Sequence, residues 1–289
     1  MVLSISDVVR ARMTEPSAVR ERLHSRSPHP GLGSDENVLV IAADHPARGA
    51  LAAGQDAMAM ADRPELLARV TTALARPGVT GILGTADLIE DLALLGALDG
   101  KMVFGSMNRG GLAGACFELD DRFTGYDARG VAEARLDGGK MLLRIDPGDP
   151  GSLATLEACA HAVDDLAERR LIAMVEPFAS HRVGGRLRND LSPDAMIRAI
   201  AIASGLGRTS AYTWLKLPVV EDMERVMAAS TLPTLILGGE VREDADEAMA
   251  GWATALALPS VRGLVIGRSL LYPRDGDVAK AVDEAVALL

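Results

Sequence analysis

The sequence has 289 residues, of which 48% are hydrophobic and 24% charged, so the chain is long enough to bury a large core. A net charge of -10 and an aromatic content of 3% argue against nucleic acid as a partner, because nucleic-acid binding calls for basic surfaces and stacking aromatics. The N-terminal segment contains the charged residues Asp7, Arg10 and Arg12 before any long apolar run, and no apolar run in the sequence is long enough for a membrane span. The two cysteines, Cys116 and Cys159, form no CxxC pair. We therefore expect a soluble cytoplasmic protein without membrane partners; the sequence leaves the oligomeric state open, and a homo-oligomer is compatible with it.

The first 36 residues precede any buried strand. They contain an amphipathic stretch from Ser6 to Arg26 and then the loop PHPGLG. This pattern predicts an N-terminal helical extension over residues 1–36, packed on a single domain that spans residues 37–289.

Short apolar runs at regular intervals predict eight strands. These are Asn37 to Asp44, Val79 to Leu83, Lys101 to Gly105, Lys140 to Asp146, Leu171 to Glu176, Tyr212 to Leu217, Thr234 to Gly238 and Gly263 to Gly267. Segments of helical character alternate with them. Runs such as VLVIAA and LIAMV are apolar on both faces, as parallel strands covered by helices must be. The pattern predicts an α/β fold, a (β/α)8 TIM barrel.

A doubly wound open sheet is the competing architecture. Such a sheet usually has a glycine-rich turn directly after its first strand, and here that turn reads DHPARG. The barrel is therefore favoured. In such barrels the chemistry lies at the carboxyl ends of the strands, where this sequence places Asp44, Arg144, Asp146, Glu176, Lys216, Glu240 and Arg268.

Two lysines are predicted to point into the barrel. Side chains alternate along the strand AYTWLKLP, so Lys216 faces inward if Leu215 and Leu217 face the helices. The same alternation in KMLLRID turns Lys140 inward. A desolvated amine beside a second cation can lose its proton and attack a carbonyl. Lys216 is the candidate nucleophile and Lys140 its electrostatic helper or proton carrier, although Lys140 starts well below the strand end and could instead serve only a structural ion pair.

Two carboxylates complete the candidate catalytic set. Glu176 ends the fifth predicted strand, and Asp44 shares the inward parity of the first. A Schiff-base enzyme needs a group that moves protons, which is the role expected of Glu176. Asp44 would bind a substrate hydroxyl or assist these proton transfers. The alternative is that both carboxylates only pair with interior lysines or with Arg48.

The last two strands end in LGGE and VIGRSL. Gly238, Gly239 and Gly267 expose backbone N–H groups beside Arg268, at a position where many barrels bind phosphate. Arg48, Arg144 and Arg186 are weaker candidates for substrate binding. Arg186 falls in a long predicted loop over residues 177–192, and loops of that length at a barrel mouth often act as lids. A second long loop is predicted over residues 105–123.

Several motifs, in this order, resemble the Schiff-base barrel aldolases, the group that contains tagatose-bisphosphate aldolase and the archaeal-type fructose-bisphosphate aldolases. AADHPARGAL resembles the first-strand aspartate motif of that family, and GKMLLRID is similar to its lysine-bearing fourth strand. The resemblance implies that Lys216 forms the imine, that Glu176 handles protons, and that Gly267 and Arg268 bind phosphate. His45, Pro46 and Trp214 depart from the family pattern and put the substrate in question.

The chain also resembles an actinobacterial aldolase-like group associated with inositol catabolism. That resemblance implies cleavage of 2-deoxy-5-keto-gluconate 6-phosphate, a phosphorylated sugar substrate, without a cofactor or a metal. The histidines offer no clustered ligand set, since only His45 and His181 lie near strand ends. A related Schiff-base thiolase or transaldolase, or a non-catalytic barrel that senses a sugar phosphate, stays open.

Overall fold

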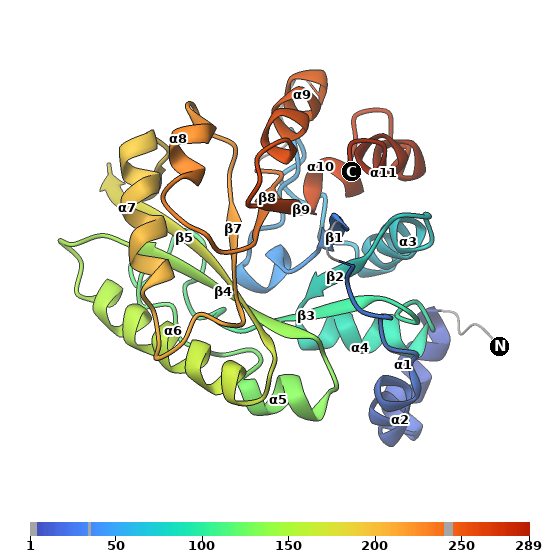
Figure 1. Ribbon diagram of the computed structural model, residues 1–289. Coiled ribbons are helices and arrows are strands. Elements are labelled where there is room, and N and C mark those ends of the chain that lie inside the picture. Colours follow the sequence, from blue (N-terminus) through green and yellow to red (C-terminus); the bar gives the residue numbers. More distant parts are fainter. Residues whose placement is uncertain (1–4, 34–35, 240–244) are drawn as a thin grey trace.

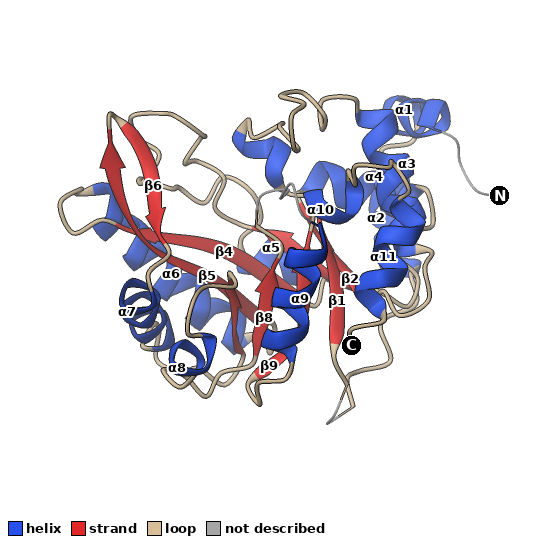
Figure 2. Ribbon diagram, turned by 90° about the horizontal axis from the view of Figure 1, so that it is seen from above, coloured by secondary structure: helices blue, strands red, loops and turns tan. Residues whose placement is uncertain are grey.

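Eight parallel strands close into a ring in the computed structural model, which describes residues 5–33, 36–239 and 245–289. The strands are β1 (Val38–Ala42), β2 (Gly81–Gly84), β3 (Met102–Ser106), β4 (Gly138–Ile145), β5 (Ile172–Val183), β7 (Thr213–Leu217), β8 (Thr234–Leu237) and β9 (Val261–Ile266). Pairing of β4 with β5 and of β1 with β9 closes the ring. Figures 1 and 2 show the helices packed around it. The predicted barrel is confirmed, and the open sheet is excluded.

The helices follow the strands in alternation. They are α3 (Arg63–Leu74), α4 (Ala86–Leu94), α5 (Ala128–Glu133), α6 (Gly151–Glu168), α7 (Pro193–Ser204), α8 (Met223–Met227), α9 (Ala245–Leu256), α10 (Arg268–Leu271) and α11 (Val278–Val286), with a 3-10 turn, η1, at His45–Arg48. Asp62, Asp127 and Ser192 cap α3, α5 and α7 by accepting a backbone N–H bond, which satisfies one of the free donors at each helix start.

The barrel has two apolar layers, as alternation along its strands requires. The larger layer lies between strands and helices and contains Leu215 and Leu217 of β7. The smaller layer fills the barrel interior, where Trp214 packs with its ring centroid 6.1 Å from that of Phe104. Because Trp214 lies two residues before Lys216 on the same face, it occupies the barrel interior below the lysine. The inward parity expected for Lys216 is thereby observed.

Two helices precede the barrel: α1 (Ile5–Thr14) and α2 (Ser17–Ser25) lie beside α4 (Figure 1). Arg12 of α1 forms ion pairs with Glu90 and Asp91 of α4 at 2.9 and 2.8 Å. Arg26, just after α2, donates to the carbonyl oxygen of Lys101. These contacts attach the N-terminal helices to the outside of the barrel.

The prediction of a long loop over residues 177–192 is wrong, because this segment forms a β-hairpin. β5 continues to Val183, and β6 (Arg186–Asp190) returns antiparallel to it with Val183 opposite Arg186. Gly184 and Gly185, both at positive φ (57° and 79°), form the two-residue turn between the strands. Such a turn needs positive φ at both positions, which glycine adopts without strain. The segment is therefore an ordered hairpin that projects from the barrel rim.

Across the described helices, none is both long and apolar enough to cross a membrane.

Candidate active site

A carboxylate held between two lysines forms the centre of the site. The Oε1 atom of Glu176 lies 3.0 Å from Nζ of Lys216, and its Oε2 atom is ion-paired with Nζ of Lys140. Strand register explains the arrangement. Met174 is level with both Lys140 and Trp214, so Glu176 lies level with Lys216 and two residues above the start of the Lys140 side chain. The long lysine side chain spans that rise of about 6.6 Å, and Lys140 reaches the site.

Asp44 lies beside this trio at the end of β1. Its Oδ2 atom accepts a hydrogen bond from Ser106 at 2.9 Å, and the guanidinium of Arg109 and the ammonium of Lys140 lie 2.7 and 3.6 Å from the same oxygen. Asp44 also precedes the η1 turn, in which Pro46 occupies a first-turn position. A proline is accommodated there because it needs no backbone N–H partner. His45 and Pro46, which interrupt the first-strand motif, thus belong to the turn that follows Asp44.

Burial and opposite charge set the ionisation of these groups. Burial alone would raise the pKa of Glu176, but Lys140 and Lys216 outweigh it and lower this pKa to about 2. Burial lowers the pKa of Lys140 to about 8, against the opposing effect of Glu176 and Asp44. For Asp44, burial is opposed and outweighed by Arg109 and Lys140, so its pKa lies well below the usual value. Near neutral pH both carboxylates are ionised, and Lys140 is the group poised to exchange a proton.

These side chains line a cavity of about 710 Å³ at the carboxyl ends of the strands. Gly238, Gly239, Gly267 and Arg268, the predicted phosphate-binding residues, line the same cavity. A Cβ atom on Gly267 would lie 2.3 Å from the carbonyl oxygen of Ala42, so only glycine fits this strand end. Glu240, the last residue of LGGE, lies outside the described residues.

The cavity is rich in positive charge. Among the described residues its lining includes Arg48, Arg109, Lys140, Arg144, Arg188, Lys216 and Arg268, against Asp44, Glu176 and Glu247. The whole chain carries a net charge of -10. Arg48 and Arg144 are paired with Asp121 and Glu118, carboxylates outside the lining, and the other five cations still outnumber the three carboxylates. This local excess of positive charge favours an anionic ligand.

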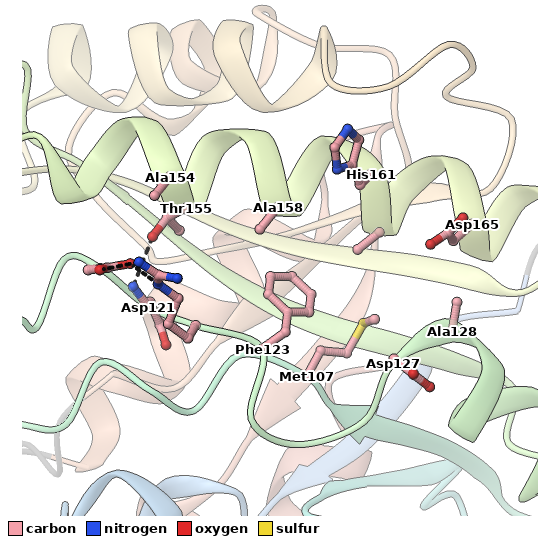
Figure 3. Close-up of a pocket in the computed structure, with 13 residues that line it drawn as sticks. Met107, Asp121, Phe123, Asp127, Ala128, Ala154, Thr155, Ala158, His161 and Asp165 are labelled. Carbon is pink, nitrogen blue, oxygen red and sulfur yellow. Dashed lines mark hydrogen bonds and ion pairs between the residues drawn. The ribbon is translucent and has the colours of Figure 1, made fainter.

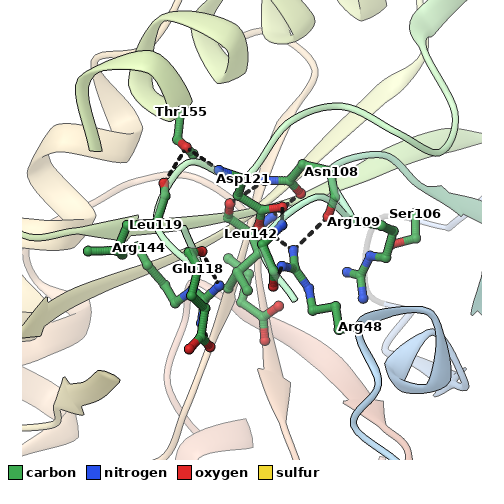
Figure 4. Close-up of polar contacts among 12 residues, drawn as sticks. Arg48, Ser106, Asn108, Arg109, Glu118, Leu119, Asp121, Leu142, Arg144 and Thr155 are labelled. Carbon is green, nitrogen blue, oxygen red and sulfur yellow. Dashed lines mark hydrogen bonds and ion pairs between the residues drawn. The ribbon is translucent and has the colours of Figure 1, made fainter. Parts of the chain in front are cut away.

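The three weaker arginine candidates differ in their surroundings. Arg48 and Arg144 line the cavity, but their guanidinium groups are bound to protein: Arg48 pairs with Asp121, and Arg144 with Glu118 at 2.6 Å. Figure 4 shows these contacts within the segment that follows β3. Arg186 lies exposed at the hairpin and is not among the cavity-lining residues. The structure thus gives Arg48 and Arg144 a role in holding the 105–123 segment.

His45 also lines the cavity. Burial is the main reason that the pKa of its imidazole falls to about 3, and the cationic side chains of Arg268, Lys216 and Lys140 add to the effect although Asp44 opposes it. The ring is therefore neutral over the physiological range. Its Nδ1 atom lies 3.9 Å from Oδ1 of Asp44, too far for a hydrogen bond.

Three residues at the site were not among the candidates from the sequence. Ser106 and Arg109 bind Asp44, and Arg109 and Arg188, the latter on β6, line the cavity. The backbone of Arg188 pairs with β5 opposite His181, but within the described part of the chain its side chain makes no hydrogen bond or ion pair. A sequence signal existed for the hairpin, since a Gly-Gly pair is typical of a two-residue turn. No local pattern could have indicated that Arg109 contacts Asp44, 65 positions away in the sequence.

A second cavity of about 240 Å³ lies outside the barrel, between α6 and the segment around residues 120–128 (Figure 3). Phe123 and Met107 line one side, and Thr155, His161 and Asp165 of α6 line the other. None of the four candidate catalytic residues lines this second cavity.

In the ranges that the structure describes, no group of three or more His, Cys, Asp or Glu side chains is arranged to hold a metal ion.

The family model of the Cgl0159-like proteins matches residues 36–286. The chain belongs to the Cgl0159-like family. It is similar to the crystal structure of Cgl0159 from Corynebacterium glutamicum, with 55% sequence identity over 98% of this chain and 95% of that one and a TM-score of 0.95. No curated protein matches the sequence.

More distant structures share the fold. A Schiff-base-forming fructose-1,6-bisphosphate aldolase is 17% identical, with a TM-score of 0.63 over 93% of this chain and 99% of that one. An archaeal fructose 1,6-bisphosphate aldolase is 16% identical, with a TM-score of 0.62 over 93% and 98% of the two chains. At this identity the likeness establishes a common barrel.

Proposed function

We propose that this protein is a class I aldolase, a lyase that cleaves a carbon–carbon bond through a Schiff base on Lys216. The observation that carries the proposal is the Glu176 carboxylate held between two buried lysines at the carboxyl end of the barrel. Burying a charged side chain costs folding free energy, and a cluster of three buried charged side chains that lines a cavity is typical of a reaction centre. The distant Schiff-base aldolases of the same fold support the same conclusion.

Imine formation uses the groups at hand. Nζ of Lys216, after releasing a proton to solvent, attacks the carbonyl carbon of the substrate, and the C=O π electrons move to the oxygen. Oε1 of Glu176, 3.0 Å from Nζ, takes a proton from the nitrogen and passes it to that oxygen, which gives the carbinolamine. The carbinolamine hydroxyl then takes a proton and leaves as water. Lys140, whose pKa is about 8 and whose ammonium is bound to Glu176, is the donor.

Carbon–carbon cleavage follows from the same arrangement. The hydroxyl on the carbon β to the iminium gives up its proton to a carboxylate, the adjacent C–C bond breaks, and its electrons move into the iminium. An aldehyde leaves, and the enamine takes a proton and is hydrolysed to a ketone. Asp44 and Glu176 are both ionised at neutral pH and are the bases for this step.

The substrate class follows from the charge and size of the cavity. Its volume of about 710 Å³ is ample for a six-carbon sugar phosphate, and the glycines and Arg268 at the ends of β8 and β9 offer a phosphate site. We infer a phosphorylated ketose or keto sugar acid. Together with the sequence resemblance to a group linked to inositol catabolism, this makes 2-deoxy-5-keto-gluconate 6-phosphate the first substrate to test, with dihydroxyacetone phosphate and malonate semialdehyde as products.

The test is cleavage of that compound in the presence of a chelator, with the release of dihydroxyacetone phosphate measured through a coupled dehydrogenase. Wild-type protein and the control Lys280→Met, an exposed lysine on α11, should release it, and Lys216→Met should not. Cleavage of another phosphorylated ketose instead would leave the reaction intact and change the substrate. Ligand binding without turnover, unchanged by Lys216→Met, would refute the aldolase and favour a sensor.

A further inference from the structure

Arg109 is a buried cation that contacts the catalytic cluster. It follows β3, and only 6% of its surface is exposed. Its Nη1 atom donates to the carbonyl oxygen of Asp44 at 2.9 Å, and its Nη2 atom lies 2.7 Å from Oδ2 of the same residue. One guanidinium thus forms a hydrogen bond with the backbone of Asp44 and an ion pair with its side chain, which holds Oδ2 on the Arg109 side of the carboxylate.

Polar and charged groups from several strands and loops surround Asp44. Ser106 from β3, Lys140 from β4 and Arg109 all approach Oδ2. His45 lies 3.9 Å from Oδ1, and Lys216 acts from β7 through its charge. Oδ1 accepts no hydrogen bond from any described residue, although Asp44 lines the cavity.

On the basis of the proposed function, we propose that Arg109 is the positioning residue of the active site: it holds Oδ2 of Asp44 and leaves Oδ1 to accept a substrate hydroxyl. Arg109 acts on the reaction through Asp44, because its hydrogen bond and its ion pair are both made to that residue. An arginine suits this role because it keeps its charge at every physiological pH, whereas Lys140 loses its proton near pH 8.

Hydrogen bonds fix the backbone next to Arg109. The side chain of Asn108 forms hydrogen bonds with both the N–H and the carbonyl oxygen of Leu142 on β4. The backbone carbonyl oxygen of Asn108 accepts a hydrogen bond from Arg48, which is paired with Asp121 (Figure 4). The residue directly before Arg109 is therefore tied to two sides of the barrel, which restricts where the guanidinium can point.

The test compares Arg109→Gln and Arg109→Lys with a control in the same segment. Arg122→Gln is that control, since the Arg122 side chain is 72% exposed and pairs with Asp120 away from the cluster. The first readout is the titration of the Asp44 carboxyl by carbon NMR of protein labelled at the aspartate carboxyls, assigned by the signal that Asp44→Asn removes. It requires no substrate, so its failure is distinct from failure of the aldolase proposal.

In Arg109→Gln the pKa of Asp44 should rise by about 1 to 3 units, the usual effect of a neighbouring opposite charge. Arg122→Gln should leave it unchanged. Arg109→Lys keeps the charge but loses the double contact, so the carboxyl should titrate nearly as in the wild type, while kcat falls about tenfold to a hundredfold with little change in KM. An unshifted Asp44 titration in Arg109→Gln, or full activity in Arg109→Lys, would overturn the proposal. Should Arg109→Gln fail to fold, the Arg109→Lys result alone decides.

Discussion

Replacement of Glu176 by glutamine removes the negative charge that two lysines share. The Glu176 side chain is 11% exposed, and those of Lys140 and Lys216 are 3% and 5% exposed. Removing one member of a buried ion pair costs about 3 to 5 kcal/mol when the remaining charge cannot be neutralised. A lysine can release its proton, however, so the cost depends on pH.

The sign of that dependence follows from Lys140. An unfolded lysine keeps its proton up to about pH 10.4, so a native lysine that is neutral makes the free energy of unfolding rise by about 1.4 kcal/mol per pH unit. In the wild type this rise begins only above the Lys140 pKa of about 8. Without Glu176, whose charge raises this pKa, the rise is already present at pH 7. The stability deficit of Glu176→Gln should therefore shrink by about 1 kcal/mol between pH 7 and pH 8.

Urea unfolding of both proteins at pH 7 and pH 8 measures this difference. The matched control is Glu118→Gln: Glu118 is also 11% exposed, but its partner is Arg144, which cannot release its proton. Its stability deficit should be the same at both pH values. A Glu176→Gln deficit that is equally independent of pH would refute the assignment of a readily lost proton to Lys140.

Two further variants probe the ends of the cavity. Arg188→Gln should raise KM by about tenfold with little change in kcat, because an arginine–anion contact made equally in ground and transition states affects binding alone. Arg186→Gln, outside the cavity lining, is its control in steady-state assays. Gly267→Ala should destabilise the protein by about 1 to 3 kcal/mol and weaken phosphate binding, because its Cβ would lie 2.3 Å from the carbonyl oxygen of Ala42. Gly251→Ala, whose Cβ meets nothing closer than 3.4 Å, should be tolerated in the same thermal melts.

The barrel could be predicted from the sequence because its signal is local. Alternation along a strand determines which side chains face inward, and it placed Lys216 and Glu176 on the interior face without knowledge of any neighbour. The reach of Lys140 could not be predicted in this way. It depends on the register between β4 and β5, where Leu142 rather than Lys140 lies level with Glu176.

The partners of the arginines could not be predicted from the sequence. An arginine at a strand end can bind an anionic ligand or a protein carboxylate, and the folded position of the neighbouring loop determines which of the two it meets. Arg48 and Arg144 are bound to Asp121 and Glu118 of the segment after β3, so their charges are largely matched within the protein. Arg109 contacts Asp44 from the same segment. These ion pairs join parts of the chain that are far apart in the sequence, so a periodic pattern of residues along the sequence cannot predict them.

The most direct test of the central proposal is borohydride trapping with dihydroxyacetone phosphate in the presence of a chelator. The chain has only four lysines, Lys101, Lys140, Lys216 and Lys280, so peptide mapping of the adduct is unambiguous. We predict a reduced adduct on Lys216 alone. An adduct on Lys140 would contradict the assigned nucleophile, and the absence of an adduct with any phosphorylated ketone on the folded protein would contradict the Schiff-base mechanism.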